Sequence, residues 1–289
     1  MTGATASFGA RLVGAVAEYG PLCAGIDPHR ELLAAWGLDD DPQGLERFAR
    51  GVVGALAGQV ALVKPQSAFF ERHGSAGVAV LERVLADARE ASLLAVLDVK
   101  RGDIGSTMGG YADAYLADGA PLAADAVTLT PYLGFGSLRP ALDAAADTGR
   151  GVFVLARTSN PDGAEVQQAR AAGRTVAQAV VDAAGAANAG HVPLGGVGVV
   201  VGATHDHGLA LAGLNGPVLA PGLGAQGATP KDLTVRFAQV NGLVLPSVSR
   251  SLLGRGPDPA ALRAEAARWR EELAAVDVGA LGQRPGAPG

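Results

Sequence analysis

Residues 93–100 read L-L-A-V-L-D-V-K, an apolar run that ends in an aspartate and a lysine. Its apolar residues are continuous rather than alternating, which is typical of a parallel strand covered by helices. Seven further runs of the same kind, each ending in turn residues, occur at 22–28, 61–67, 126–132, 151–158, 197–204, 217–224 and 243–250. The pattern therefore predicts eight parallel strands.

Segments with helical spacing lie between these runs, for example 44–56 and 77–91. Eight strand–helix units without a linker predict a single (β/α)8 TIM barrel, an α/β fold, over residues 1–279. A doubly wound open sheet is the alternative, but eight evenly spaced units favour closure. We expect the N-terminal segment to form an amphipathic helix, residues 186–193 a loop, and residues 280–289 a disordered tail.

Composition narrows the possible partners. The chain has 289 residues and a net charge of −5 without a block of like charges, so nucleic acid and anionic membrane surfaces are unfavourable partners. No uncharged apolar run is long enough to span a bilayer. The single cysteine, Cys23, excludes an internal disulfide and lies in an apolar stretch, where we expect a buried thiol. These features predict a cytoplasmic protein.

Polar residues end the predicted strands, and chemistry in a barrel of this kind collects at the carboxyl ends of its strands. They are Asp27, Lys64, Asp98 with Lys100, Thr130, Ser159, Thr204, Gln226 and Arg250. Asp98 and Lys100 are two positions apart, so on an extended strand they point to the same side. Asp103 follows three residues later, in the next loop.

Lys64 and Lys100 are two of only three lysines in the chain. With Asp98 and Asp103 they would place four charges at one barrel mouth, which is costly to desolvate unless the cluster has a function. Neighbouring carboxylates favour a protonated lysine, whereas a Schiff-base lysine must be neutral. The residues therefore suggest a charged proton donor at Lys100, with helix caps or surface ion pairs as the structural alternative.

The last two predicted strands carry a second signal. Residues 220–230 read A-P-G-L-G-A-Q-G-A-T-P, and residues 247–253 read S-V-S-R-S-L-L. Loops after strands seven and eight usually bind phosphate in this fold, through backbone N–H groups and an arginine. Gln226 and Arg250 are the candidates, although a structural turn and a surface arginine would give the same pattern. Together the two signals suggest a phosphorylated small substrate and a proton-linked step.

The stretch D-V-K-R-G-D-I-G-S-T (98–107) resembles the D-x-K-x-x-D signature of the orotidine 5′-monophosphate decarboxylase family. G-I-D-P, V-K-P-Q-S-A-F-F-E, T-S-N-P, P-G-L-G-A-Q-G and S-V-S-R resemble the same family, in particular its longer bacterial (type 2) branch. The matches follow one another in order over roughly residues 8–275. The resemblance implies a cofactor-free enzyme of pyrimidine biosynthesis that converts orotidine 5′-monophosphate (OMP) to UMP and CO2.

The resemblance also implies a role for each matched residue. Lys100 would protonate C6 of the pyrimidine, and Asp98 would lie beside the departing carboxylate. Asp27 and Lys64 would bind ribose hydroxyls, and Ser159 would contact the pyrimidine. The phosphate would be held by Gln226 and Arg250 under a mobile loop around 222–231.

In this family the last aspartate of the signature comes from the neighbouring subunit. The resemblance therefore implies a homodimer in which Asp103, with Ile104 and Thr107, completes the partner's site. It implies no metal.

One departure from the family pattern, one histidine pair and two alternative functions remain to be considered. The strand-eight end L-P-S-V-S-R lacks the asparagine of the usual versions but keeps the arginine. T-H-D-H-G (204–208) has two histidines that suggest a metal pair, but without a third ligand such histidines are more often solvated loop residues. A metal-dependent sugar-phosphate lyase of the same superfamily is expected to carry an acidic ligand where this chain has Lys64. A non-catalytic phosphosugar-binding barrel would have no need of the charge cluster.

Overall fold

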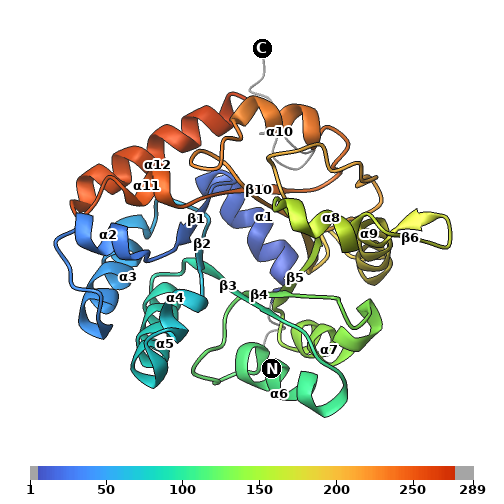
Figure 1. Cartoon of the computed structure of the whole chain (residues 1–289), viewed down its shortest axis with the longest axis horizontal. Helices are drawn as coiled ribbons and strands as arrows, with labels where there is room; N and C mark the ends of the chain where they lie inside the picture. The colour runs from blue at the N-terminus through green and yellow to red at the C-terminus, as the bar shows by residue number, and fades with distance from the viewer. Residues whose placement is uncertain (1–5, 277–289) are drawn as a thin grey trace.

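Eight parallel strands close into a barrel in the computed structural model, which describes residues 6–276 (Figure 1). The order around the barrel is β1-β10-β9-β8-β5-β4-β3-β2. The strands are β1 Cys23–Ile26, β2 Leu62–Pro65, β3 Leu94–Arg101, β4 Ala126–Leu129, β5 Gly151–Arg157, β8 Val197–Val201, β9 Val218–Pro221 and β10 Val244–Val248. Each coincides with one predicted run to within a few residues.

Pairing of the first strand with the last closes the barrel, with Cys23 opposite Ser247 and Ala24 opposite Val248. The predicted (β/α)8 barrel is therefore confirmed, and the open-sheet alternative is wrong. The expected domain boundary at residue 279 and the expected tail at 280–289 lie outside the described residues.

Helices surround the strands, most of them on the outside of the barrel (Figure 1). They are α1 Phe8–Tyr19, α2 Arg30–Ala35, α3 Pro42–Leu56, α4 Ala68–Glu71, α5 Gly74–Glu90, α6 Gly105–Leu116, α7 Arg139–Asp147, α8 Ala164–Gln167, α9 Val176–Ala187, α10 Pro230–Arg236, α11 Arg250–Leu253 and α12 Pro259–Ala274, with 3₁₀ turns η1 Phe135–Leu138 and η2 Pro161–Gly163. The segments predicted as helices at 44–56 and 77–91 correspond to α3 and α5. Among the helices of residues 6–276, none has the length and apolarity that a membrane crossing requires.

A short antiparallel hairpin, β6 Arg170–Ala171 and β7 Arg174–Thr175, lies between β5 and α9 and is absent from the prediction. Each of its strands has only two residues, which is too short for an apolar run to predict it. The loop expected at 186–193 begins where α9 ends at Ala187.

Side-chain caps begin several of the outer helices. Asp41 accepts a hydrogen bond from the Gly44 backbone N–H at 2.7 Å, directly before Pro42 at the first turn of α3. Thr229 and Asp232 form a reciprocal capping box at the start of α10. Such caps satisfy N–H groups that have no partner within the helix, so they define where these helices begin.

The N-terminal helix α1 closes the amino-terminal end of the barrel, and Figure 1 shows it across the middle of the ring of strands. Its buried residues Phe8 and Leu12 share a core with inward-facing residues such as Leu62 and Phe153. A side chain at Gly151 would lie 2.3 Å from the Phe8 ring, so glycine is required where β5 passes this helix. Within residues 6–276, α1 fills that end of the barrel and leaves the carboxyl end open for a site.

Candidate active site

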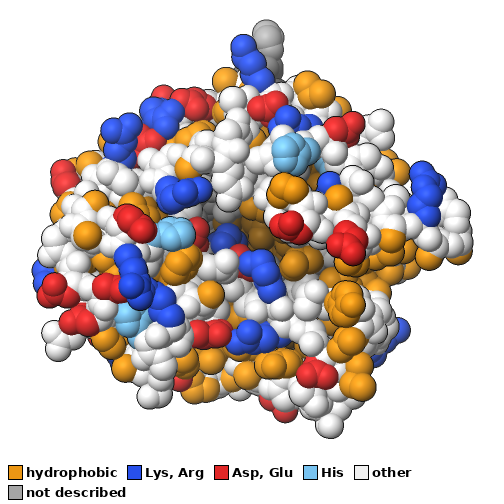
Figure 2. Space-filling view, in the orientation of Figure 1, with side chains coloured by type: hydrophobic (Ala, Val, Ile, Leu, Met, Phe, Trp, Pro, Cys, Tyr) orange, Lys and Arg blue, Asp and Glu red, His pale blue; other side chains and the backbone are white. Residues whose placement is uncertain are grey.

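A cavity of about 600 Å³ opens at the carboxyl ends of the strands. Figure 2 shows the hollow in the centre of this face, with charged side chains in and around it. Its polar lining comprises Asp27, His29, Lys64, Gln66, Asp98, Lys100, Thr128, Thr158, Ser159, Asn160, Gln167, Gln226, Ser247, Ser249 and Arg250. Phe69, Leu155, Val200, Leu219, Pro221, Leu223 and Ala225 provide an apolar wall.

Asp98 is the buried centre of the charged part of this cavity. Its Oδ2 lies 2.9 Å from Lys64 Nζ, and its Oδ1 lies 2.6 Å from Lys100 Nζ and 2.7 Å from the Thr128 hydroxyl, which donates to it. With the Gln66 amide oriented so that its nitrogen faces Asp98, that nitrogen donates to Oδ2 at 3.0 Å. Both carboxylate oxygens therefore accept two hydrogen bonds each.

These contacts decide the charge of Asp98. Burial alone would raise its pKa, but the ammonium groups of Lys64 and Lys100 hold the pKa well below its ordinary value. Burial likewise acts to lower the pKa of Lys64, yet Asp98 and Asp27 raise it above its ordinary value. Asp98 is thus a fixed anion and Lys64 a fixed cation.

Asp27 lies beside this cluster, at the end of β1. Its Oδ1 is 3.9 Å from Lys64 Nζ, and this buried atom has no hydrogen-bond partner among the described residues. A side chain at Gly25 would strike Ser249 at 2.8 Å, so a glycine at this position lets β1 and β10 approach each other at the cavity. Asp27 is therefore positioned to accept hydrogen bonds from a ligand.

Lys100 reaches Asp98 by a route that the strand pattern did not predict. Its φ is +45°, in the left-handed region, and the register of β3 against β4 shifts between Leu97 and Arg101. The two side chains meet at the cavity, as expected for residues on the same side of the strand, but the extended geometry assumed at Lys100 is wrong. The Lys100 side chain is 43% exposed, against 8% for Lys64.

Asp103 does not join the charge cluster within this chain. Together with Ile104 and Thr107, it lies outside the cavity lining, at the start of α6. Asp103 Oδ1 accepts a hydrogen bond from the Ile104 backbone N–H at 2.8 Å, and the Ile104 side chain is 62% exposed. The single chain therefore brings Lys64, Asp98 and Lys100 together and leaves Asp103 on the rim.

Ser159, Gln226 and Arg250 all line the cavity, as predicted. Arg250 is exposed and has no carboxylate within 4.0 Å among residues 6–276, so its guanidinium is free for an anion. The glycine-rich loop before it is folded back on itself: Gly224 N donates to Ala228 O at 3.0 Å, and Ala228 N donates to Gly222 O at 3.1 Å.

Gln66 and Thr128 are functional candidates that the strand ends did not predict. Thr130, the predicted candidate directly after β4, is absent from the cavity lining, whereas Thr128 two positions earlier donates a hydrogen bond to Asp98. Gln66 lies in V-K-P-Q-S, two positions after Lys64. Its place at the end of the same predicted strand is the feature of the sequence that could have indicated it.

The two histidines at 205 and 207 have separate surroundings. His205 is exposed, while His207 is engaged at both ring nitrogens: Nδ1 accepts from the Leu209 backbone N–H at 3.0 Å, and Nε2 lies 2.6 Å from the Arg236 carbonyl oxygen. Within residues 6–276, no group of three or more His, Cys, Asp or Glu side chains has metal-binding geometry.

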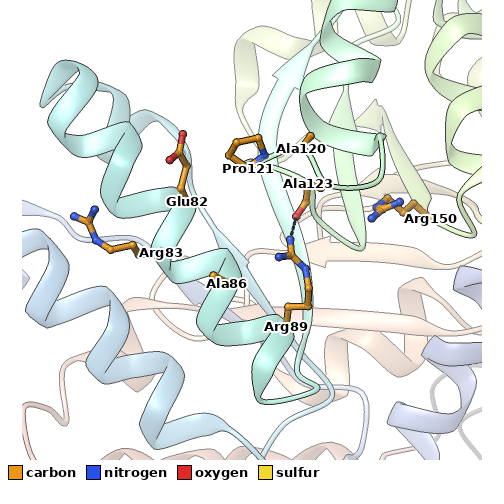
Figure 3. A pocket seen from close by; sticks show the side chains of 9 residues that line it. Glu82, Arg83, Ala86, Arg89, Ala120, Pro121, Ala123 and Arg150 are labelled. Carbon is orange, nitrogen blue, oxygen red and sulfur yellow. Dashed lines mark hydrogen bonds between the residues drawn. The ribbon is translucent and has the colours of Figure 1, made fainter.

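A second cavity of about 550 Å³ lies between α5 and the segment that precedes β4 (Figure 3). Its arginines are largely engaged: Arg89 donates to the Ala123 carbonyl at 2.9 Å, Arg83 contacts Glu46, and Arg150 contacts Asp118. Ala123 precedes β4 and Arg150 precedes β5, so this cavity lies at the amino-terminal end, away from Asp98.

Known proteins share both the sequence and the fold of this chain. The model of the orotidine 5′-phosphate decarboxylase / HUMPS family matches residues 20–265. Orotidine 5′-phosphate decarboxylase from Salinispora arenicola is 62% identical over 94% of this chain and 99% of that protein. A Streptomyces avermitilis structure assigned to the same enzyme is 55% identical, with a TM-score of 0.89 over 94% of this chain and 96% of that one.

The Leishmania donovani OMP decarboxylase structure is more distant, at 31% identity and a TM-score of 0.74, and covers 93% of this chain and 98% of its own. These likenesses extend over the strands that carry Lys64, Asp98 and Lys100. The chain therefore belongs to the orotidine 5′-phosphate decarboxylase / HUMPS family.

Proposed function

We propose that this protein converts orotidine 5′-monophosphate to UMP and CO2, a step of pyrimidine biosynthesis, and that it does so without a cofactor. The observation that carries the proposal is the buried Asp98 carboxylate held between Lys64 and Lys100 in a cavity that Arg250 also lines. The names of its 62%- and 55%-identical relatives support the same reaction.

The charges suit the chemistry of decarboxylation. Breaking the bond between C6 and the carboxylate carbon leaves the electron pair on C6, and Lys100 donates a proton to that carbon as CO2 departs. Its ammonium stabilises charge that develops only in the transition state, which is how a preorganised group accelerates a reaction. Because the Lys100 side chain is half-exposed, the amine recovers its proton from solvent.

Asp98 remains ionised because four donors surround it. We infer that it lies beside the substrate carboxylate, where repulsion between the two anions is relieved when neutral CO2 leaves. Lys64 keeps the cavity from accumulating negative charge, and with Asp27 it binds the ribose hydroxyls. The unpartnered Asp27 oxygen supports this role.

The remaining lining residues bind the two ends of the nucleotide. Ser159 contacts the pyrimidine, and Gln226 with Arg250 holds the phosphate, where an arginine fork suits the oxygens of the anion. Phosphate binding far from C6 then contributes to catalysis by ordering the loop around 222–231 over the substrate.

We also propose a homodimer in which Asp103, Ile104 and Thr107 complete the site of the partner subunit. The rim position of Asp103 and the exposure of Ile104 support this arrangement. Tyr132 and Leu133, which follow the neighbouring strand β4, are also exposed, at 78% and 53%. Large apolar side chains on one rim are typical of a surface that another chain covers. A cytoplasmic location, proposed from the single-cysteine composition, completes the assignment.

An OMP assay on chelator-treated protein tests the reaction. We expect UMP formation at the same rate with and without EDTA. Loss of activity on chelation would instead indicate a metal-dependent lyase, and tight UMP binding without turnover would indicate a binding protein.

Mixing two inactive variants tests the shared site. A hybrid dimer of Lys100→Ala and Asp103→Ala chains contains one site with both residues intact, so random exchange restores about a quarter of the wild-type sites. Mixtures as inactive as the separate variants would contradict the shared site.

A further inference from the structure

Thr128 connects the two central groups of the candidate active site through one hydroxyl. It lies on β4, is 1% exposed, and donates from Oγ1 to Asp98 Oδ1 at 2.7 Å. The same oxygen accepts a hydrogen bond from the backbone N–H of Lys100 at 3.0 Å. One side chain thus contacts both the buried anion and the main chain of the proton donor.

The backbone at Lys100 explains why this second contact is needed. β3 and β4 pair regularly at Leu97 opposite Val127, but the next pair is Arg101 opposite Leu129. Four steps along β3 therefore correspond to two steps along β4, and Lys100, with φ +45°, lies within the extra length. A buried N–H that loses its partner in the ladder must find another acceptor, and the Thr128 hydroxyl is that acceptor.

A left-handed backbone at a residue with a side chain is unfavourable and persists only where its surroundings hold it. Here the conformation has a consequence, because it turns the Lys100 side chain so that Nζ reaches Asp98 Oδ1 at 2.6 Å. A regular strand would carry the lysine further along the barrel axis. The register shift between β3 and β4 and the left-handed backbone therefore help to place the Lys100 ammonium next to Asp98.

We propose that Thr128 is a positioning residue for the decarboxylation, setting the rotation of the Asp98 carboxylate and the backbone of Lys100 at the same time. This inference rests on the proposed function, since it assigns a role within that reaction. Thr128 acts through Asp98 and Lys100 and takes no proton from the substrate. Its hydroxyl is the active part, and its methyl group only fills space.

Paired substitutions separate the hydroxyl from the methyl group. Thr128→Val keeps the shape and removes the hydroxyl, whereas Thr128→Ser keeps the hydroxyl and removes the methyl. We expect Thr128→Val to lower kcat for OMP about 10- to 100-fold, the effect of displacing a reacting group by up to about 1 Å. The KM for OMP and the affinity for UMP should change less than about threefold, because the ribose and phosphate contacts remain. Thr128→Ser should retain kcat within about threefold.

Thr130→Val is the matched control, since it removes a hydroxyl two positions further along the same segment and outside the cavity lining. It should behave as wild type. A purely structural role of Thr128 predicts a different result. The serine variant, which leaves a gap, would then be at least as impaired as the valine variant, and the affinity for UMP would fall in parallel.

Thermal unfolding and UMP binding show whether each variant is folded. Should Thr128→Val not fold, Thr128→Ser is compared with Thr128→Ala, and equal kcat values in that pair overturn the inference. An active wild-type enzyme with an equally active Thr128→Val also overturns it, while leaving the proposed reaction intact. A wild-type protein without OMP turnover would instead reject the proposed function itself.

Discussion

The ammonium of Lys100 lies 2.6 Å from Oδ1 of Asp98, a residue only two positions before it in the chain. The other oxygen of this carboxylate binds Lys64, whose side chain is almost completely buried. The two lysines therefore share one anion but differ in access to solvent. This difference suits the proposed mechanism, in which Lys64 stays a fixed cation and Lys100 is the proton donor.

Replacing Lys100 tests its proposed role as the proton donor. Lys100→Ala should abolish turnover and change the free energy of unfolding by less than about 1 kcal/mol, because Lys100 is half-exposed and three other donors still surround the Asp98 carboxylate. Lys100→Arg should also be inactive, since a guanidinium keeps the charge but does not give up its proton. OMP turnover and urea unfolding measure the two effects. Appreciable activity in the arginine variant would contradict proton donation by Lys100.

Replacing Asp98 tests whether its carboxylate keeps the buried Lys64 charged. Asp98→Asn leaves the Lys64 ammonium buried without its principal counter-charge, and breaking a buried pair in this way costs about 3 kcal/mol or more. Urea unfolding should therefore show a large decrease in the free energy of unfolding for Asp98→Asn and a small decrease for Lys100→Ala. Equal losses would mean that Lys64 does not depend on Asp98 for its charge.

The ion pair of Asp98 and Lys64 also makes the stability of the protein depend on pH in acid. The pKa of Asp98 in the folded protein is below its ordinary value of about 3.9, so the unfolded chain binds more protons there. This contribution is complete above about pH 4 and is lost as the pH falls through the lower, folded pKa. Unfolding free energies measured from pH 7 down to pH 3 should fall less steeply in Asp98→Asn than in wild type.

The sequence predicts those site residues whose position follows from the pattern within a single strand. Continuous apolar runs indicate the strands, and the polar residues that end them include Lys64, Asp98 and Lys100. Thr128 and the left-handed turn at Lys100 depend on the register between β3 and β4, which no pattern within either strand reveals. The spacing places Asp103 in the loop after the strand, but only the family resemblance assigns it to the neighbouring subunit's site, because its proposed partners lie on another chain.

Asn188 offers a test of how the barrel holds β8. Its fully buried amide donates to the carbonyl oxygens of Val197 and Leu214 at 2.7 and 2.9 Å and accepts from the Val197 N–H at 3.0 Å. Asn188→Leu leaves these backbone groups without partners, at a cost of about 3 kcal/mol. The exposed Asn241 is the control, and Asn241→Leu should change the urea midpoint little. Similar midpoints for the two variants would contradict this role.

His207 predicts a second pH dependence, of different origin. Burial lowers its pKa below the ordinary value, although the hydrogen bond to the Arg236 carbonyl and the nearby Asp206 oppose that shift. Protonation would also remove the Nδ1 lone pair that accepts from Leu209. Its contribution to stability is complete above about pH 6.5 and is lost as the pH falls through the lower, folded pKa.

Melting temperatures between pH 7.5 and 5 measure this effect. His207→Gln should show a shallower decline with falling pH than wild type, because its side chain does not titrate. His205→Gln removes an exposed histidine two positions earlier and should retain the wild-type slope. A wild-type slope in His207→Gln would place the titrating group elsewhere.

Arg250 provides a test of the proposed phosphate site in the cavity. Its guanidinium has no acidic partner within the described chain, so its removal disturbs no ion pair. Arg250→Ala should raise the KM for OMP about 10- to 100-fold, the value of one or two hydrogen bonds to a charged group. With orotidine, which lacks the phosphate, wild type and Arg250→Ala should have the same kcat/KM, since the arginine then has nothing to bind. An equal loss with both substrates would assign Arg250 to the barrel structure and not to phosphate binding.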